Sequence, residues 1–445
     1  MGNDARGLIM PLIGVANIQG TLDGEITPEL VLNIGKTIGT QYKSVTIARD
    51  LHPTSMMVRS SLIAGLTAAG ANVHDAGIVP SPVLPFASKG TECCVTIGSP
   101  ESRDCVSGLR FWNTDGTFFT DSQMFAFGSR FEKEKMLPSF KSIGDVRYVT
   151  GSIDNYRAKV AKEIGMVDCQ VVVDCASGCA SLVAPQLITD IGADALTVNC
   201  HSDGRSPGRS PSLEEINLKT LSKVVKSNYG SIGIALNGDG GRIAAIDEDG
   251  RYVDGTTLLA LFIKFFQPKN IAIPIDTTMA VKDLMKGNIV ITKLGAHHVG
   301  ESIKNNGLDT GGCEDGSFFI SKISYAPDGI AAAAYISKIA SESSLRDVID
   351  ELPTYLRENT SVRYSEDRDG IAKRICSKIG DVDYINMYDV DGWRVEMESG
   401  WFLVRFSDTD SVIDITVEAR DKAYVVGLME IAKQIVTSSL KPVNI

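Results

Sequence analysis

Short apolar runs alternate with longer stretches of helical spacing over most of the chain. From about residue 40 to residue 350, runs of strand length lead through Gly-rich turns into helical patterns. This order recurs over residues 40–140, 155–245 and 255–350, and it predicts three α/β domains. Near the end, residues 391–419 instead read as strands separated by turns, which predicts an antiparallel sheet. We expect domains at 1–152, 153–252, 253–358 and 359–445.

The stretch from Gly233 to Gly255 shows the pattern most clearly. Two apolar runs, IALN and RIAAI, flank a loop of Gly and Asp residues, which predicts two strands joined by a tight turn. Two interpretations of the loop stay open. It is either an ordinary hairpin turn, for which Asn-Gly and Asp-Gly are strong signals, or a metal or phosphate loop. In the second case Asn237 and Asp239 offer oxygens and Arg242 offers a charge. These residues alone favour the turn.

Local signals elsewhere predict further features. Thr27 and Pro28 are suited to the N-cap and first position of a helix. An apolar strand ends at Gly98-Ser99, and a serine at such a turn can act as a nucleophile, although it is also a common turn residue. The adjacent His297 and His298 are expected in a strand, where they would point to opposite faces.

Composition narrows the class of protein. The chain has 445 residues, of which 43% are apolar and 22% are charged, as in soluble multidomain proteins. A net charge of −11 argues against a nucleic-acid-binding surface. No apolar run reaches the ~20 residues that a membrane span requires, and no signal peptide is visible. Nine cysteines without C-x-x-C spacing are expected to be free thiols in a reducing cytoplasm.

Several motifs together resemble the α-D-phosphohexomutase family, which comprises phosphomannomutases, phosphoglucomutases and phosphoglucosamine mutases. A segment similar to the family's PGR-x-P-x-P-x-x-x-N-L lies within residues 203–225, ahead of a loop that resembles the family's Mg²⁺-binding DGDxDR. The resemblance covers nearly the full length. It implies three similar α/β domains and a C-terminal α+β domain around a central cleft. It also implies interconversion of the 1- and 6-phosphates of a hexose through a phosphoserine.

The resemblance carries roles to particular positions. Ser99 is the best counterpart of the phosphoserine, although its alignment needs an inserted residue, and Ser102 is a second candidate. Arg110 stands in for the family's catalytic lysine, and Asn237 and Asp239 occupy the metal loop. The positions implied for substrate binding are Arg49, Arg242, Gly312, Glu314, Ser317, Arg405, Ser407 and Thr409.

All five functional motifs of the family are altered in this chain. The replacements are Gln19 in the first loop, Pro100 and Glu101 in the serine loop, Asn237 and Gly241 in the metal loop, Cys313 in the sugar loop and Asp408 in the phosphate loop. With two carboxylates missing, Mg²⁺ binding is expected to be weak or absent.

Two functions therefore stay open. The first is a divergent mutase (an isomerase) that is very slow or inactive on common hexose 1-phosphates. The second is an inactive paralogue that binds a phosphosugar or a partner subunit. Either way, Arg49, Arg110, Arg242 and Arg405 are expected to make the cleft positive. The expected partner is a small phosphosugar, with neither nucleic acid nor membrane, and a homodimer is possible.

Overall fold

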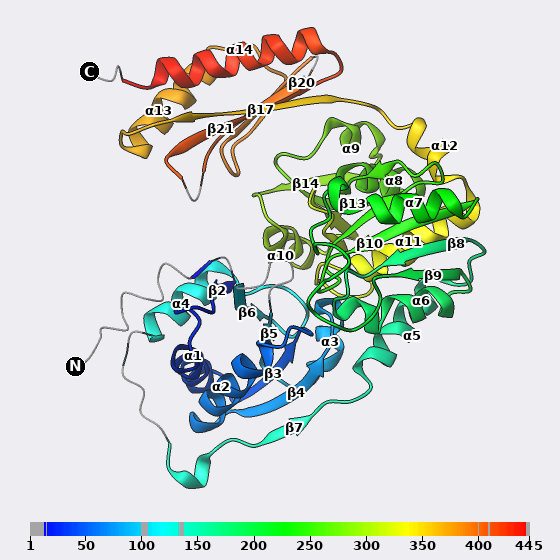
Figure 1. Ribbon diagram of the computed structural model, residues 1–445. Coiled ribbons are helices and arrows are strands. Elements are labelled where there is room, and N and C mark those ends of the chain that lie inside the picture. The colour runs from blue at the N-terminus through cyan, green and yellow to red at the C-terminus, as the bar shows by residue number, and fades with distance from the viewer. Residues whose placement is uncertain are drawn as a thin grey trace.

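The computed structural model describes residues 13–14, 16–98, 106–131, 133, 138–398, 400–407 and 410–441. These residues form four separate β-sheets, each with its own helices (Figure 1). The prediction of three α/β units followed by a unit with an antiparallel sheet is confirmed. The domain boundaries stay predictions. Ser99, Pro100, Glu101, Ser102, Asp408 and Thr409 lie outside the described residues.

The first sheet combines a parallel and an antiparallel half. Its order is β1-β2-β6-β5-β3-β4-β7, with β5, β3, β4 and β7 parallel and the remaining pairs antiparallel. The Thr27 hydroxyl accepts a hydrogen bond from Leu30 N at 3.2 Å, so the predicted N-cap of α1 is confirmed. The elements are β1 (Ile13–Gly14), β2 (Asn17–Thr21), α1 (Pro28–Gln41), β3 (Ser44–Arg49), α2 (Ser55–Ala68), β4 (Asn72–Ile78), α3 (Leu84–Ala87), β5 (Cys93–Ile97), β6 (Val106–Trp112), α4 (Asp121–Phe131) and β7 (Val146–Tyr148).

The second sheet contains the predicted hairpin. Strands β10 and β11 pair antiparallel up to Leu236 and Ile243, so the loop at 237–242 closes a tight connection. Strands β8 and β9 are parallel to β10, as the βαβ pattern predicts. The elements are α5 (Ser152–Ile164), β8 (Gln170–Asp174), α6 (Ala184–Asp190), β9 (Asp194–Val198), α7 (Lys219–Ser227), β10 (Ser231–Leu236), β11 (Ile243–Ile246) and β12 (Tyr252–Val253).

The third unit shares its core with the second. Its order is β14-β13-β15-β16, parallel except for the last pair. The alanine-rich helix α11 is buried over most of its length and packs on α5 and α6, so one hydrophobic cluster spans both units. The elements are α8 (Gly255–Phe266), β13 (Asn270–Pro274), α9 (Met279–Leu284), β14 (Asn288–Thr292), α10 (Ala296–Asn306), β15 (Thr310–Gly312), β16 (Phe318–Ile320), α11 (Gly329–Glu342) and α12 (Leu345–Asp350).

The fourth unit is an antiparallel sheet in the order β17-β21-β20-β19-β18. Alternate residues of β21 are buried, and α14 packs on the sheet as the topmost element of the view (Figure 1). The elements are β17 (Leu356–Arg363), α13 (Arg368–Ile379), β18 (Asn386–Tyr388), β19 (Trp393–Met397), β20 (Gly400–Phe406), β21 (Val412–Ala419) and α14 (Lys422–Ser439).

None of the described helices is both long enough and apolar enough to cross a bilayer. The longest of them, α14, keeps one face buried against the C-terminal sheet, where Val425, Leu428 and Ala432 belong to its core.

The histidine pair corrects one expectation. His297 and His298 lie in the first turn of α10, and their ring centroids are 3.7 Å apart, so the prediction of a strand with opposite-facing rings is wrong. The apolar spacing explains the difference, because Val299 and Ile303 are both buried four residues apart, as on one face of a helix.

A buried polar contact joins the third and fourth units. Arg394 is fully buried and donates to the carbonyls of Ile275 and Thr277 at 2.8 and 2.6 Å. Its guanidinium lies over the Trp401 ring, 4.1 Å from the centroid, and it pairs with Glu396 at 3.0 Å. The last sheet is thus attached to the loop that follows β13.

We expect Arg394→Met to loosen this attachment. The change leaves two carbonyls without their donor and Glu396 without one of its two cationic partners, and losing one member of a buried pair costs about 3–5 kcal/mol. Hydrogen exchange at 275–279 and 393–419 should accelerate. Arg420→Met is the matched control, because Arg420 pairs with Asp283 across the same two units but is 70% exposed. Equal protection in both variants would contradict the role given to Arg394.

Candidate functional site

The loop at 237–242 is held by hydrogen bonds from its own backbone N–H groups to its own side-chain oxygens. Asn237 Oδ1 accepts from Arg242 N at 3.0 Å, and Asp239 Oδ1 accepts from Gly241 N at 3.0 Å. Gly240 has a φ of 74°, a left-handed conformation that favours glycine. Asn237 and Asp239 are only 2% and 8% exposed, so both residues are buried against the rest of the protein.

Asp239 ties this loop to the first unit. Its Oδ2 accepts from Ser81 Oγ at 2.8 Å, and its carbonyl accepts from Ser81 N at 3.0 Å. Arg110, on β6, places Nη1 3.6 Å from the same Oδ2. The Arg110 guanidinium also lies about 6 Å from the ring centroids of Trp112 and Phe118, which direct it toward Asp239. The Asp239 carboxylate, in the loop predicted to bind a metal, therefore faces the Arg110 guanidinium.

The loop at 313–317 meets the loop at 237–242 along the backbone. Arg242 and Ser317 form an antiparallel bridge, and Ile243 N donates to Gly316 O at 3.0 Å. Arg242 Nε lies 3.2 Å from Asp315 Oδ2, which adds an ion pair beside the bridge. The predicted metal and sugar loops are thus held side by side by bonds that do not depend on a ligand.

Two hollows lie on either side of the 313–317 loop. The first, of about 240 Å³, joins the first unit to the two loops. Its lining includes Asn17, Arg110, Asn237, Asp239, Arg242, His297, Asp315 and Ser317. The second, of about 390 Å³, lies between the 313–317 loop and the C-terminal sheet. Its lining includes Asp276, Glu314, Arg357, Asn359, Thr360, Ser361, Arg405 and Asp414.

The second hollow holds a compact group of charges. Arg357 Nη1 makes a short contact with Glu314 Oε1, and Arg357 Nη2 lies 3.9 Å from Asp276 Oδ2. Burial, followed by the charge of Asp276, raises the pKa of Glu314 to about 7. Burial also raises the pKa of Asp276. Arg405 is bound by Asp391, with Nε 2.9 Å from Oδ2.

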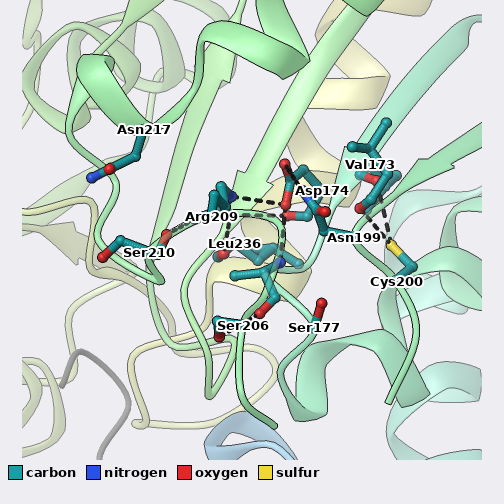
Figure 2. A network of polar contacts seen from close by, with 12 residues as sticks. Val173, Asp174, Ser177, Asn199, Cys200, Ser206, Arg209, Ser210, Asn217 and Leu236 are labelled. Carbon is teal, nitrogen blue, oxygen red and sulfur yellow. Dashed lines mark hydrogen bonds and ion pairs between the residues drawn. The ribbon is translucent and has the colours of Figure 1, made fainter. Parts of the chain in front are cut away.

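Behind the site, a buried network fixes the end of β10 (Figure 2). Arg209 donates from Nε to Asp174 Oδ1 at 2.8 Å and from Nη2 to Leu236 O at 2.7 Å. Asp174 also accepts from Asn199 Nδ2 at 3.0 Å. Leu236 immediately precedes the loop, so this guanidinium positions Asn237 through the backbone.

The structure places the remaining candidate residues as follows. Arg49 lines a narrow space with Gln19, Arg110 and Asp239. Gly312 is buried in β15, where a Cβ would meet Leu259 at 2.9 Å. Ser407 N donates to Val412 O at 3.0 Å at the end of β20.

Sequence reasoning missed three contributors. It gave no role to Ser81, which binds Asp239, or to Asp276 and Arg357 in the second hollow. The one local signal for Ser81 is the turn at Ser81 and Pro82, which resembles the family's G-x-x-x-T/S-P, and nothing local marks the other two.

The donor set does not suit Mg²⁺, which prefers several anionic oxygens in octahedral geometry. Asp239 is the single carboxylate of the loop, and both of its oxygens already face donors or a cation. The Asn237 oxygen accepts a backbone hydrogen bond. No cluster of three His, Cys, Asp or Glu suitable for a metal occurs within the described part of the chain.

Comparisons with known proteins match most of the chain to one family. The family descriptions "Phosphoglucomutase/phosphomannomutase, alpha/beta/alpha domain" I, II and III match residues 10–137, 147–250 and 254–355. A protein called probable phosphoglucosamine mutase from Methanosarcina acetivorans is 35% identical over 97% of this chain and 100% of its own length.

Solved structures share the fold. A phosphoglucomutase/phosphomannomutase family protein from Burkholderia thailandensis has a TM-score of 0.84 at 21% identity, covering 96% of this chain and 97% of that one. Aspergillus fumigatus N-acetylphosphoglucosamine mutase in complex with GlcNAc-6P and magnesium has a TM-score of 0.52 at 13% identity, over 89% of this chain and 83% of that one.

We expect Arg209→Met to destabilise the protein by about 3–5 kcal/mol, because it leaves the buried Asp174 without its counter-charge. The side chains of Arg209 and Asp174 are only 4% and 1% exposed. Calorimetric unfolding should show a lowered midpoint. Arg147→Met is the control, since Arg147 and Asp145 form an ion pair at 73% and 70% exposure and should contribute about 0–1 kcal/mol. Similar midpoints for the two variants would refute the proposed role.

Proposed function

Since the chain belongs to the phosphoglucomutase/phosphomannomutase family, we propose that it is a divergent mutase of a hexosamine phosphate. The supporting observation is the convergence of loops from three units, in which Asp239 contacts Ser81 and Arg110 while Arg242 contacts Asp315 and Ser317. The name of the 35% identical relative favours glucosamine over glucose or mannose.

The proposed reaction moves a phosphoryl group between a serine and the sugar. The serine Oγ–P bond breaks as a sugar hydroxyl oxygen bonds to phosphorus, and the hydroxyl proton passes to the departing serine Oγ. The other phosphoryl group of the resulting sugar bisphosphate then returns to the serine Oγ by the reverse step. Ser99 remains the proposed carrier. Arg110, beside Asp239 in the first hollow, is placed to neutralise charge on the transferring group.

Turnover is proposed to be slow because the charges of the cleft are already engaged. Arg110, Arg242 and Arg405 each lie beside a carboxylate. A phosphate must share these guanidiniums with the carboxylates that already lie beside them, and the donor set does not suit a Mg²⁺ ion that would supply further positive charge. A loss of one preorganised electrostatic donor typically lowers kcat about 10²–10³-fold, although losses within one site do not simply multiply.

The second candidate function is binding of a phosphosugar without turnover. It is favoured by the direct pairing of Asp239 with Ser81 and Arg110. In this pairing the carboxylate that a metal ion would need and the guanidinium that a phosphoryl group would need are bound to each other.

The activity prediction is turnover well below the usual enzyme range of about 1–10³ s⁻¹. A coupled assay with glucosamine, glucose and mannose 1-phosphates, each primed with the matching 1,6-bisphosphate, measures it. Arg110→Gln should lower any residual rate further. Rates within the usual range that disappear in Ser99→Ala would show a fully competent mutase and overturn the prediction. Calorimetric binding of a hexose phosphate without detectable turnover would support the second candidate function.

The metal prediction is weak Mg²⁺ binding, without micromolar affinity at the 237–242 loop. Calorimetric titration of the wild type tests it directly. The double variant Asn237→Asp with Gly241→Asp adds two carboxylates to a loop where Gly241 has ordinary backbone angles, and it should raise affinity. Gly241→Ala changes the backbone preference without adding an oxygen and serves as the control. Micromolar Mg²⁺ affinity of the wild type at this loop is the result that would prove the prediction wrong.

A further inference from the structure

We propose that the hollow between the 313–317 loop and the C-terminal sheet recognises a protonated amine on the sugar, with Asp276 and Glu314 as its acceptors. The inference rests on the proposed function, because it assigns the substrate's amine to particular residues of that cleft. Asp276 becomes a specificity-determining residue that neither the motifs nor the comparisons assign.

Two acidic side chains from different elements share one cation in this hollow. Asp276 comes after β13 and Ile275, Glu314 lies in the turn between β15 and β16, and Arg357 belongs to β17. Arg357 contacts Glu314 closely but stands 3.9 Å from Asp276, beyond hydrogen-bonding distance. Asp276 and Glu314 both line the hollow, so their carboxylate oxygens are available to a cationic donor of a ligand.

The cation beside the two carboxylates leaves them partly unpaired. Arg357 Nε is buried and has no hydrogen-bond partner in the described part of the protein, so this N–H bonds neither carboxylate. Because the atom is shielded from solvent, a ligand in the hollow is expected to engage the carboxylates rather than Arg357 Nε. An amino sugar offers the ammonium that these carboxylates accept.

The charge balance of the hollow points to the same class of ligand. Its charged lining comprises three carboxylates, Asp276, Glu314 and Asp414, against the two guanidiniums of Arg357 and Arg405. A phosphate dianion alone adds negative charge beside two acidic groups whose charged forms burial already disfavours, and this repels it. A hexosamine phosphate carries its own positive charge, and that charge can lie against Asp276 and Glu314. The phosphate of a hexose without an amine, or of an N-acetylated hexosamine, lacks this compensation.

The test compares three ligands on the full chain. Isothermal titration with glucosamine 6-phosphate, glucose 6-phosphate and N-acetylglucosamine 6-phosphate at pH 7 measures affinity for wild type and for Asp276→Asn. We expect the wild type to prefer the amine. The variant should bind glucosamine 6-phosphate about tenfold to a hundredfold more weakly, which is the usual effect of removing a hydrogen bond to a charged group. Its affinity for glucose 6-phosphate should instead rise or hold, because one carboxylate that repels the phosphate is lost.

Two further variants make the result specific. Glu314→Gln tests the second acceptor and serves in place of Asp276→Asn if that protein does not fold. Asp350→Asn is the matched control, because Asp350 also pairs with an arginine, Arg251, at 2.7 Å, but is exposed at the end of α12 and does not line the hollow. It should keep the wild-type preference.

The outcomes separate this inference from the proposed reaction. Equal wild-type affinity for the amine and the neutral sugar, an unchanged preference in both acceptor variants, or no binding of any hexose phosphate would overturn the inference. A preference for the amine that Asp276→Asn abolishes would support it. If that preference occurs without turnover, the mutase proposal fails while the assignment of the amine site stands.

Discussion

The geometry of the cleft depends on where one buried guanidinium places the end of β10. Arg209 bonds the Asp174 carboxylate and the Leu236 carbonyl at once, so the parallel strands β8 and β10 end in fixed relation (Figure 2). A buried charge pair is worth little as net stability, but removing one partner is costly. The pair therefore acts as a positional constraint on the loop that begins at Asn237.

From that loop, contacts spread to two other units. Asp239 receives the hydroxyl and the amide of Ser81, and Arg242 continues into the backbone bridge with Ser317. Gly178 permits the close packing underneath, because a Cβ there would lie 2.2 Å from the Gly238 carbonyl oxygen. Hydrogen bonds within the protein thus set the positions of the loops at 237–242 and 313–317 relative to the first unit. No bound ion is needed to hold these loops together.

Sequence reasoning succeeded where structure is determined locally. The hairpin at 233–246 and the helix start at Thr27 follow from turn and cap residues close together in the chain. It failed at His297, because the few apolar positions near this residue fit a helix as well as a short strand. The partners of Asp239 and Glu314 could not be read, since Ser81 is 158 residues from Asp239 and Arg357 is 43 residues from Glu314. Only the tertiary fold brings such residues together.

The same limit changes the electrostatic interpretation of the cleft. Counting arginines along the sequence predicts a positive cleft, but Arg110, Arg242 and Arg405 each lie beside Asp239, Asp315 and Asp391 respectively. Each guanidinium can donate to more than one acceptor, so a phosphate can join these pairs rather than break them. A guanidinium that already donates to a carboxylate then contributes less binding free energy to the phosphate than an arginine without a carboxylate partner would. Selectivity in such a cleft comes from how well the whole charge pattern of a ligand, anionic and cationic groups together, fits carboxylates and guanidiniums that are already in place.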